Sequence, residues 1–327
     1  MTVAVTGAAG HVGANLVRAL LAEGRSVRAL VRDDTRGVDG LDVETIRADV
    51  LDPASLREAF DGVDVVYHLA ARITIAGDPG GNVARTNIEG PRNVVSACLD
   101  ARVKRLVHFS SIHALSSSPT DESIDEHRPL AAEDRSRLPI YDRTKSDGQR
   151  EVFTGIERGL DAVIINPTAI LGPYDYNQSA AGAAVVGIMR GELPALVDGG
   201  FNWVDVRDVV NGALAAEKRG KAGESYLLGG EWRSVRDLAA LIGEVTGVAV
   251  PRIVTPWWLA RIGVPFITLW SKLTGTSPLY TADSLRALRN HQNISCDKAQ
   301  TELGYSHRPL RETLEVACEW YRSAGIA

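Results

Sequence analysis

The fold of this chain is decided by the stretch Thr6-Gly7-Ala8-Ala9-Gly10-His11-Val12-Gly13. The apolar run Thr2-Val3-Ala4-Val5 precedes it, an amphipathic segment from about His11 to Glu23 follows, and a second apolar run spans residues 26–31. Glycines at this spacing let the backbone lie against a pyrophosphate, while the free N–H groups and positive end of the following helix face the phosphates. This order predicts a βαβ unit that binds a dinucleotide through Gly7, Gly10, His11, Val12 and Gly13. A purely structural glycine turn is the alternative.

The composition is that of a globular enzyme. The 327 residues are 45% hydrophobic and 24% charged, which predicts a large core in one big domain with a smaller appendage. A net charge of -5 argues against a protein built around nucleic acid or an anionic membrane. Met1 runs directly into the first strand, so we expect no signal peptide and a cytoplasmic protein. The scattered Cys98, Cys296 and Cys318 indicate reduced thiols, and no metal site is expected.

The end of the second strand bears on the choice between NAD and NADP. NAD-dependent proteins usually offer a carboxylate to the ribose hydroxyls there, whereas NADP-dependent ones offer an arginine to the 2′-phosphate. The strand ends in Val31-Arg32-Asp33-Asp34, which puts Arg32 closest to the ribose. Its guanidinium can pair with a phosphate and stack on adenine. The sequence therefore favours NADP, while Asp33 and Asp34 keep NAD open, and a solvated turn is the plainest interpretation.

Two further segments are expected beside the cofactor. Asp49-Val50 follows the third strand at the sheet edge where adenine would lie, and the Asp49 carboxylate can accept a hydrogen bond from the adenine amine. Leu69-Ala70-Ala71 follows the fourth strand, and its small residues allow the backbone to approach the cofactor closely. We interpret the preceding His68 as a packed residue at the strand end and not as a catalyst.

Three side chains carry the predicted chemistry. The fifth strand, residues 105–109, delivers Ser110-Ser111 at its carboxyl end, the edge where ligands bind in open parallel sheets. Tyr141 and Lys145 are four residues apart, so a helix places them on one face. A free tyrosine titrates near pH ~10, and a nearby cation lowers its pKa by favouring the phenolate. We expect Tyr141 to be the acid or base and Lys145 to lower its pKa and hold the cofactor ribose. Ser111 would bind the substrate oxygen, with Ser110 as the alternative.

With these motifs in place, the chain resembles the extended short-chain dehydrogenase/reductase family along nearly its whole length. Besides the motifs above, the matching pieces are Thr86-Asn87-Ile88-Glu89-Gly90 and Asn166-Pro167-Thr168. The resemblance implies an α/β fold with a doubly wound Rossmann-type parallel sheet of about seven strands and a smaller C-terminal substrate-binding domain. It also implies that Asn87 lies in the active site as a catalytic residue and that Pro167 and Thr168 back the nicotinamide.

The resemblance implies domain boundaries and an assembly as well. The dinucleotide-binding domain takes residues 1–166 and about 200–229, and the substrate-binding domain takes about 167–199 and 230–327. A homodimer is implied through the helices around residues 87–101 and 141–158. Within the family, residues 27–32 and 229–234 look most like the dihydroflavonol reductase branch, with related hydroxysteroid dehydrogenases close by.

The substrate class depends on the residues expected near the pocket. Nucleotide-sugar epimerases and dehydratases share this scaffold, and an arginine in them commonly grips the diphosphate of the substrate. Phe201 occupies that place here, and a diphosphate without its cation would bind poorly. The sequence predicts a mostly apolar pocket for a small-molecule carbonyl compound or alcohol. Its expected lining is His113, Tyr174, Asn177, Phe201 and Trp203.

These residues together predict an NADP-dependent carbonyl reductase or alcohol dehydrogenase. Two alternatives stay open: an NAD-dependent nucleotide-sugar epimerase or dehydratase, and a regulator that binds NADP without chemistry.

The apolar, tryptophan-rich segment 255–270 is interrupted by Arg261 and Pro265 and is too short to span ~30 Å of hydrocarbon. We interpret it as a helix that caps the substrate pocket, with a membrane-surface patch as the alternative.

Overall fold

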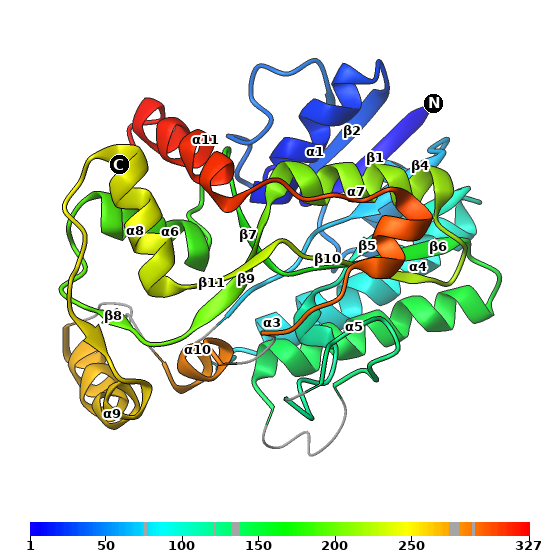
Figure 1. Cartoon of the computed structure of the whole chain (residues 1–327). Helices are drawn as coiled ribbons and strands as arrows, with labels where there is room; N and C mark the ends of the chain where they lie inside the picture. The colour runs from blue at the N-terminus through cyan, green and yellow to red at the C-terminus, as the bar shows by residue number, and fades with distance from the viewer. Residues whose placement is uncertain (75–76, 121, 132–137, 275–280, 290–291) are drawn as a thin grey trace.

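The computed structural model describes residues 1–74, 77–120, 122–131, 138–274, 281–289 and 292–327. At its centre is a seven-stranded sheet in the order β10-β6-β5-β4-β1-β2-β3 (Figure 1), and every strand pair in it is parallel. The strands are β1 Thr2–Thr6, β2 Ser26–Val31, β3 Glu44–Arg47, β4 Val65–His68, β5 Arg105–Phe109, β6 Ala162–Pro167 and β10 Ser225–Leu228. The predicted Rossmann-type sheet of seven strands is confirmed.

Helices cover both faces of this sheet, which explains why its inner strands are apolar on both sides. All four residues of β4 and all six of β6 are buried. One face packs against α1 His11–Ala22 and α7 Val206–Arg219, and the other packs against α2 Pro53–Phe60, α4 Gly90–Asp100 and α5 Ile140–Glu157. Short helical pieces lie between them: α3 Asn82–Ala84, η1 Arg85–Glu89 and η2 Ile112–Ala114.

The second part of the chain is built on two small sheets. One has the order β11-β9-β7, with β7 Ala169–Leu171, β9 Gly200–Asp205 and β11 Glu231–Ser234, and the other pairs β8 Leu196–Val197 with β12 Val254–Thr255. The surrounding helices are α6 Ala180–Met189, α8 Val235–Thr246, α9 Trp257–Thr274, α10 Ala282–Ala287, η3 Ala299–Leu303 and α11 Leu310–Ser323. Residues 200–205 thus pair within the smaller sheet, and the two-domain boundaries stay a prediction.

The strand order reverses beside β1, because β2 lies on one side of β1 and β4 on the other. In open parallel sheets the ligand site lies at such a reversal, outside the carboxyl ends of the strands. The glycine turn after β1, the 69–71 segment after β4 and the serines after β5 all leave the sheet at this edge. The described part of the chain contains no helix with the length and apolarity to cross a membrane.

Candidate active site

The glycine turn joins β1 to α1 in the conformation that phosphate binding requires. Gly7 has a φ of +69°, and a Cβ on Gly13 would lie 2.2 Å from the carbonyl oxygen of Gly7, so both positions need glycine. The helix begins at His11 behind Gly10, which has no side chain to cap it, and the first turn carries no acidic residue. The first N–H groups of α1 therefore point toward the sheet edge with no capping side chain, as a pyrophosphate needs.

The carboxylates at the end of β2 are already paired with cations. Asp33 pairs with Arg47 at 2.8 Å, and Asp34 pairs with Arg36 at 2.9 Å. The hydrogen bond from Arg36 lowers the pKa of Asp34 to about 2. Arg32 is exposed and forms no hydrogen bond or ion pair with any residue that the structure describes. A ligand phosphate bound at the end of β2 could therefore pair with the guanidinium of Arg32.

Two loops predicted to contact the cofactor are held by hydrogen bonds at the same edge. Asp49 is half-buried, and one of its carboxylate oxygens accepts a hydrogen bond from the N–H of Leu51 at 2.9 Å. The hydroxyl of Thr6 accepts hydrogen bonds from the N–H groups of Leu69 and Ala70, which ties the 69–71 segment to the end of β1. Val50 is buried under this edge, and Val12 packs against the core with α1.

The residues predicted for catalysis meet beside the end of β5. Ser111 is the second residue after that strand, and Tyr141 is the second residue of α5. The Ser111 hydroxyl accepts a hydrogen bond from the N–H of His113 at 3.2 Å and lies close enough to the Tyr141 hydroxyl to lower its pKa by hydrogen bonding. Lys145 lies one turn further along α5, is buried, and donates a hydrogen bond from Nζ to the carbonyl of Phe109 at 2.9 Å. The buried Oγ of Ser110 has no hydrogen-bond partner among the described residues. Of the two serines, the structure thus brings Ser111 to Tyr141.

The pKa values differ from the expectation for this pair. Burial raises the pKa of Tyr141 to about 12, and only the hydrogen bond from Ser111 acts in the opposite direction. Burial lowers the pKa of Lys145 to about 8. The expectation that Lys145 lowers the pKa of Tyr141 is therefore not met in this structure, because desolvation dominates and the ammonium group is engaged by Phe109.

Asn87 holds backbone around the site, and both of its amide protons are engaged. Its side-chain oxygen accepts a hydrogen bond from the N–H of Arg72, and its amide donates to the Arg72 carbonyl and to the Thr144 hydroxyl. The Thr144 hydroxyl in turn donates to the carbonyl of Tyr141 at 3.0 Å. Asn87 thus connects the loop after β4 to the first turn of α5, and its direct role in catalysis stays a prediction.

Comparison with known proteins identifies the family of the chain. The model of the NAD dependent epimerase/dehydratase family matches residues 3–229. The chain belongs to this family. It is an enzyme of the extended short-chain dehydrogenase/reductase superfamily, and its family binds a nicotinamide cofactor.

Relatives with known names cover the whole chain. The protein is 34% identical to sterol demethylase protein B of Methylococcus capsulatus, over 100% of both chains. It is 31% identical to a putative dihydroflavonol 4-reductase of Synechocystis, over 98% of this chain and 94% of the relative. A crystal structure of a nucleoside-diphosphate-sugar epimerase from Pseudomonas aeruginosa superimposes with a TM-score of 0.81 at 26% identity, covering 100% of this chain and 99% of that one.

Two buried histidines lie beside Lys145, and only His68 was singled out from the sequence, as a packed residue. His68 and His108 are register partners at the ends of β4 and β5, their rings are 5.2 Å apart, and both are buried. Because the Thr6 hydroxyl accepts from two N–H groups, its own proton goes to Nδ1 of His68 at 2.7 Å. Burial lowers the pKa of His68 to about 3, so the pair is neutral beside Lys145. In the sequence, a histidine near the end of each of two adjacent strands was the signal that could have predicted this pair.

Only one of the residues predicted to bind substrate lies beside Tyr141. His113 contacts its ring edge-on with centroids 5.6 Å apart, and Nδ1 of His113 is 3.1 Å from the carboxylate of Asp142. Asn177 instead donates to Asp34 and accepts from Arg36, at the end of β2. Tyr174 lies under the guanidinium of Arg18, at 3.9 Å from the ring centroid, and against Trp320.

The aromatic residues of β9 have contacts of their own within the smaller part of the molecule. Trp203 is buried, and its indole N–H donates to the carbonyl of Arg233 at 3.1 Å. Phe201 packs against Trp203 and against the apolar cluster that joins α9 to α10. The structure therefore does not bring Tyr174, Asn177, Phe201 and Trp203 together with Tyr141. Thr168, which follows Pro167 at the end of β6, donates to Asn202 at 3.0 Å.

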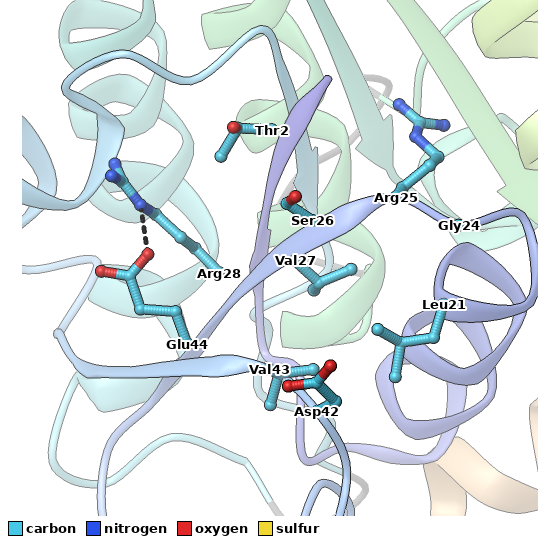
Figure 2. A pocket seen from close by; sticks show the side chains of 10 residues that line it. All are labelled: Thr2, Leu21, Gly24, Arg25, Ser26, Val27, Arg28, Asp42, Val43 and Glu44. Atoms are coloured by element: carbon cyan, nitrogen blue, oxygen red, sulfur yellow. Dashed lines mark hydrogen bonds and ion pairs between the residues drawn. The ribbon is translucent and has the colours of Figure 1, made fainter.

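A cavity of about 410 Å³ opens at the opposite edge of the sheet, at the amino ends of β1, β2 and β3. Figure 2 shows its lining, in which Arg28 is paired with Glu44 at 2.8 Å. Ligands of open parallel sheets bind at the carboxyl ends of the strands, so we assign no ligand to this cavity.

The described residues hold no group of three or more His, Cys, Asp or Glu that could bind a metal ion.

Proposed function

We propose that this protein is an NADP-dependent reductase that interconverts a ketone and a secondary alcohol on a mostly apolar small molecule. The observation that carries the proposal is the contact of Ser111 with Tyr141, next to the buried Lys145 and at the sheet edge of the glycine turn. These groups supply a hydrogen-bond donor and a proton donor to one oxygen atom, which is what reduction of a carbonyl requires.

The residues at the edge fit a dinucleotide. The uncapped start of α1 suits the pyrophosphate, and the close-packed Gly7 and Gly13 suit the tight turn before it. The uncommitted guanidinium of Arg32 supports a 2′-phosphate, and hence NADP, because Asp33 and Asp34 already have cationic partners. Asp49, Val50, Leu69, Ala70, Ala71, Pro167 and Thr168 would complete the site, and NADPH would supply the hydride when bound.

Each polar residue of the site has a distinct proposed task. Ser111 donates a hydrogen bond to the substrate carbonyl oxygen and orients it toward Tyr141. Tyr141 transfers its phenolic proton to that oxygen as the carbonyl carbon is reduced. Lys145 stands one helical turn away, where its ammonium group would hold the ribose of the cofactor. Asn87 and Thr144 hold the first turn of α5 in place for this transfer.

The protonation state of Tyr141 supports the reductive direction at neutral pH. With its pKa raised to about 12, the phenol keeps its proton in the range where the cytoplasm works. A proton donor must be protonated before the reaction, whereas the reverse oxidation needs the phenolate. The oxidative direction should therefore accelerate as the pH rises above neutral.

The apolar substrate class rests on two observations. By resemblance to the family, Phe201 takes the place of the arginine that holds the diphosphate of a nucleotide sugar, and in the structure Phe201 packs into an apolar cluster. Two relatives that cover the chain are named for a sterol and for a dihydroflavonol, both of which are polycyclic and mostly apolar. His113 is the candidate for direct contact with such a substrate, since it lies against Tyr141.

Titration of the purified protein with NADPH and NADH, together with analysis of any nucleotide that copurifies, tests the proposal. Preferential binding of NADPH by an empty protein, followed by its oxidation with steroid-like or flavonoid-like ketones, is the expected result. The similarity to a nucleoside-diphosphate-sugar epimerase favours one second candidate. Tightly retained NAD with interconversion of nucleotide sugars would establish that function instead. NADPH binding without turnover of any ketone would favour the regulator.

The assembly and the compartment are proposed on the sequence alone. We infer a homodimer through α4 and α5, and a cytoplasmic location. Sedimentation velocity of the purified protein measures the first, and fractionation of the source cells measures the second.

A further inference from the structure

Helix α9 is apolar on two sides. On its inner side Trp257, Ala260 and Val264 pack into the cluster around Leu285 and Leu288. The indole N–H of Trp257 also donates to the carbonyl of Leu285 at 2.7 Å. This spacing of three and four residues is that of one helix face, so the inner side attaches α9 to α10.

The outer side of α9 is covered by nothing in the described chain. Trp258 is 61% exposed, Leu259 46% and Ile262 58%, and Ile253, which precedes the helix, is 67% exposed. Four of the seven large apolar side chains exposed in the described residues thus lie within ten residues of sequence. We call these four side chains the α9 surface. Figure 1 shows α9 at the outer end of the smaller part of the molecule, away from the seven-stranded sheet.

The charge around the α9 surface is opposite to that of the whole protein. No aspartate or glutamate occurs between residues 245 and 282, although the chain carries a net charge of -5. Arg252 and Arg261 are exposed in this stretch. The apolar cluster on the inner side of α9 includes residues of β8, β9, α8 and α10. Within two residues of these in the sequence lie four further arginines and three aspartates, namely Arg233, Arg236, Arg286, Arg289, Asp198, Asp237 and Asp283. The neighbourhood therefore has more positive than negative groups.

We propose that the α9 surface docks the protein on an anionic lipid bilayer, with α9 lying in the plane of the interface. Tryptophan and aliphatic side chains enter the boundary between headgroups and acyl chains, while arginines beside them face anionic headgroups. A second copy of this chain fits less well. A twofold contact centred on the α9 surface would bring Arg252 and Arg261 against the same arginines of the other copy. This inference does not depend on the proposed reductase function.

Vesicle binding of the full chain tests this proposal directly. Vesicles of phosphatidylcholine and phosphatidylglycerol in equal parts are compared with vesicles of phosphatidylcholine alone, by cosedimentation and by the blue shift of tryptophan fluorescence. We expect binding to the anionic vesicles that weakens as salt is added. The combined variant Trp258→Ser, Leu259→Ser, Ile262→Ser should lower this binding about tenfold or more. Ile73→Ser is the matched control, since Ile73 is similarly exposed outside the α9 surface.

Charge reversal separates the electrostatic part of the binding. Arg252→Glu combined with Arg261→Glu should weaken binding to the anionic vesicles and leave the weak binding to phosphatidylcholine unchanged. Arg57→Glu on α2 is the control, because Arg57 is exposed far along the chain from α9. All variants change exposed side chains, and their unfolding temperatures should match that of the unchanged protein.

Three results would overturn the proposal. The first is absence of binding to the anionic vesicles. The second is equal binding by the triple serine variant, which would place the contact elsewhere. The third is a dimer that the triple serine variant dissociates in sedimentation velocity, without vesicle binding by the unchanged protein. In that case the α9 surface joins two copies of the chain.

Discussion

The ammonium group of Lys145 donates a hydrogen bond to the carbonyl oxygen of Phe109 at a distance of 2.9 Å. This contact joins α5 to the end of β5 across 36 residues of sequence, and it buries a cation next to the neutral His68 and His108. A single acceptor does not replace the hydration of an ammonium group, and burial accordingly lowers the pKa of Lys145 to about 8. Burial of the Lys145 ammonium group therefore lowers the free energy of unfolding.

That cost predicts how stability depends on pH. In the unfolded chain the lysine has its ordinary pKa of 10.5, so between about pH 8 and pH 10.5 the unfolded state holds more protons than the folded state. The free energy of unfolding of the unchanged protein should thus rise with pH relative to that of Lys145→Met, by up to about 3 kcal/mol. Urea unfolding of both proteins at neutral pH and at about pH 9.5 measures this difference. Lys218→Met, at an exposed lysine, should show no such trend, and a constant difference for Lys145→Met would contradict the burial argument.

Replacement of Tyr141 by phenylalanine should remove the proton donor without removing the cofactor site. We expect ketone reduction to fall roughly a hundredfold to ten-thousandfold while the Kd for NADPH changes little. Stopped-flow turnover and fluorescence titration give the two quantities. Tyr176→Phe is the matched control, because Tyr176 packs against Trp320. If Tyr141→Phe lost NADPH binding instead, the role assigned to Tyr141 would be wrong.

The two adjacent serines should behave differently. Ser111→Ala removes the hydroxyl that contacts Tyr141, and we expect a loss of roughly a hundredfold in kcat. Ser110→Ala removes a buried hydroxyl that has no partner among the described residues, so its kcat should stay close to that of the unchanged protein. Steady-state kinetics of both variants decides between them. A larger loss for Ser110→Ala would reverse the assignment.

Arg32 should account for the preference between the two cofactors. Arg32→Ala is expected to raise the KM for NADPH about tenfold to a hundredfold and to leave the KM for NADH nearly unchanged, since only NADPH carries the 2′-phosphate. Arg47→Ala is the control, because Arg47 is equally a surface arginine but is paired with Asp33. Equal effects on both cofactors would show that Arg32 does not recognise the phosphate.

The glycine turn should not tolerate a side chain at Gly13. A Cβ there would lie 2.2 Å from the Gly7 carbonyl and 2.8 Å from that of Ala8, and these are backbone atoms that cannot rotate away. We expect Gly13→Ala to lower the free energy of unfolding by about 1–3 kcal/mol or more. Gly187→Ala in α6 has room for its methyl group and should instead raise it by about 0.5–1 kcal/mol. Urea unfolding of both variants measures the contrast, and equal stabilities would refute it.

The sequence predicted those features that depend on neighbours in the chain. The spacing of Gly7, Gly10 and Gly13 after an apolar run was sufficient for the first βαβ unit, and the four-residue spacing was sufficient to place Tyr141 and Lys145 on one helix face. Both patterns act within one or two helical turns, where backbone geometry is nearly independent of the rest of the protein. The seven-stranded sheet was implied by the resemblance to the family, and the structure confirms it.

Contacts between segments that are distant in the sequence could be identified only in the tertiary structure. Asn177 was predicted near the substrate but contacts Asp34, which is 143 residues away in the sequence. The choice of Ser111 over Ser110 and the partner of Lys145 likewise depend on how α5 packs against β5.

The sequence by itself therefore predicted the family and its sheet, because its motifs depend on local spacing, and it supplied the candidates for the reactive groups. Only the tertiary structure decided which groups touch and how far burial moves their pKa values. Desolvation depends on every segment that packs around a side chain, and no local pattern records that packing.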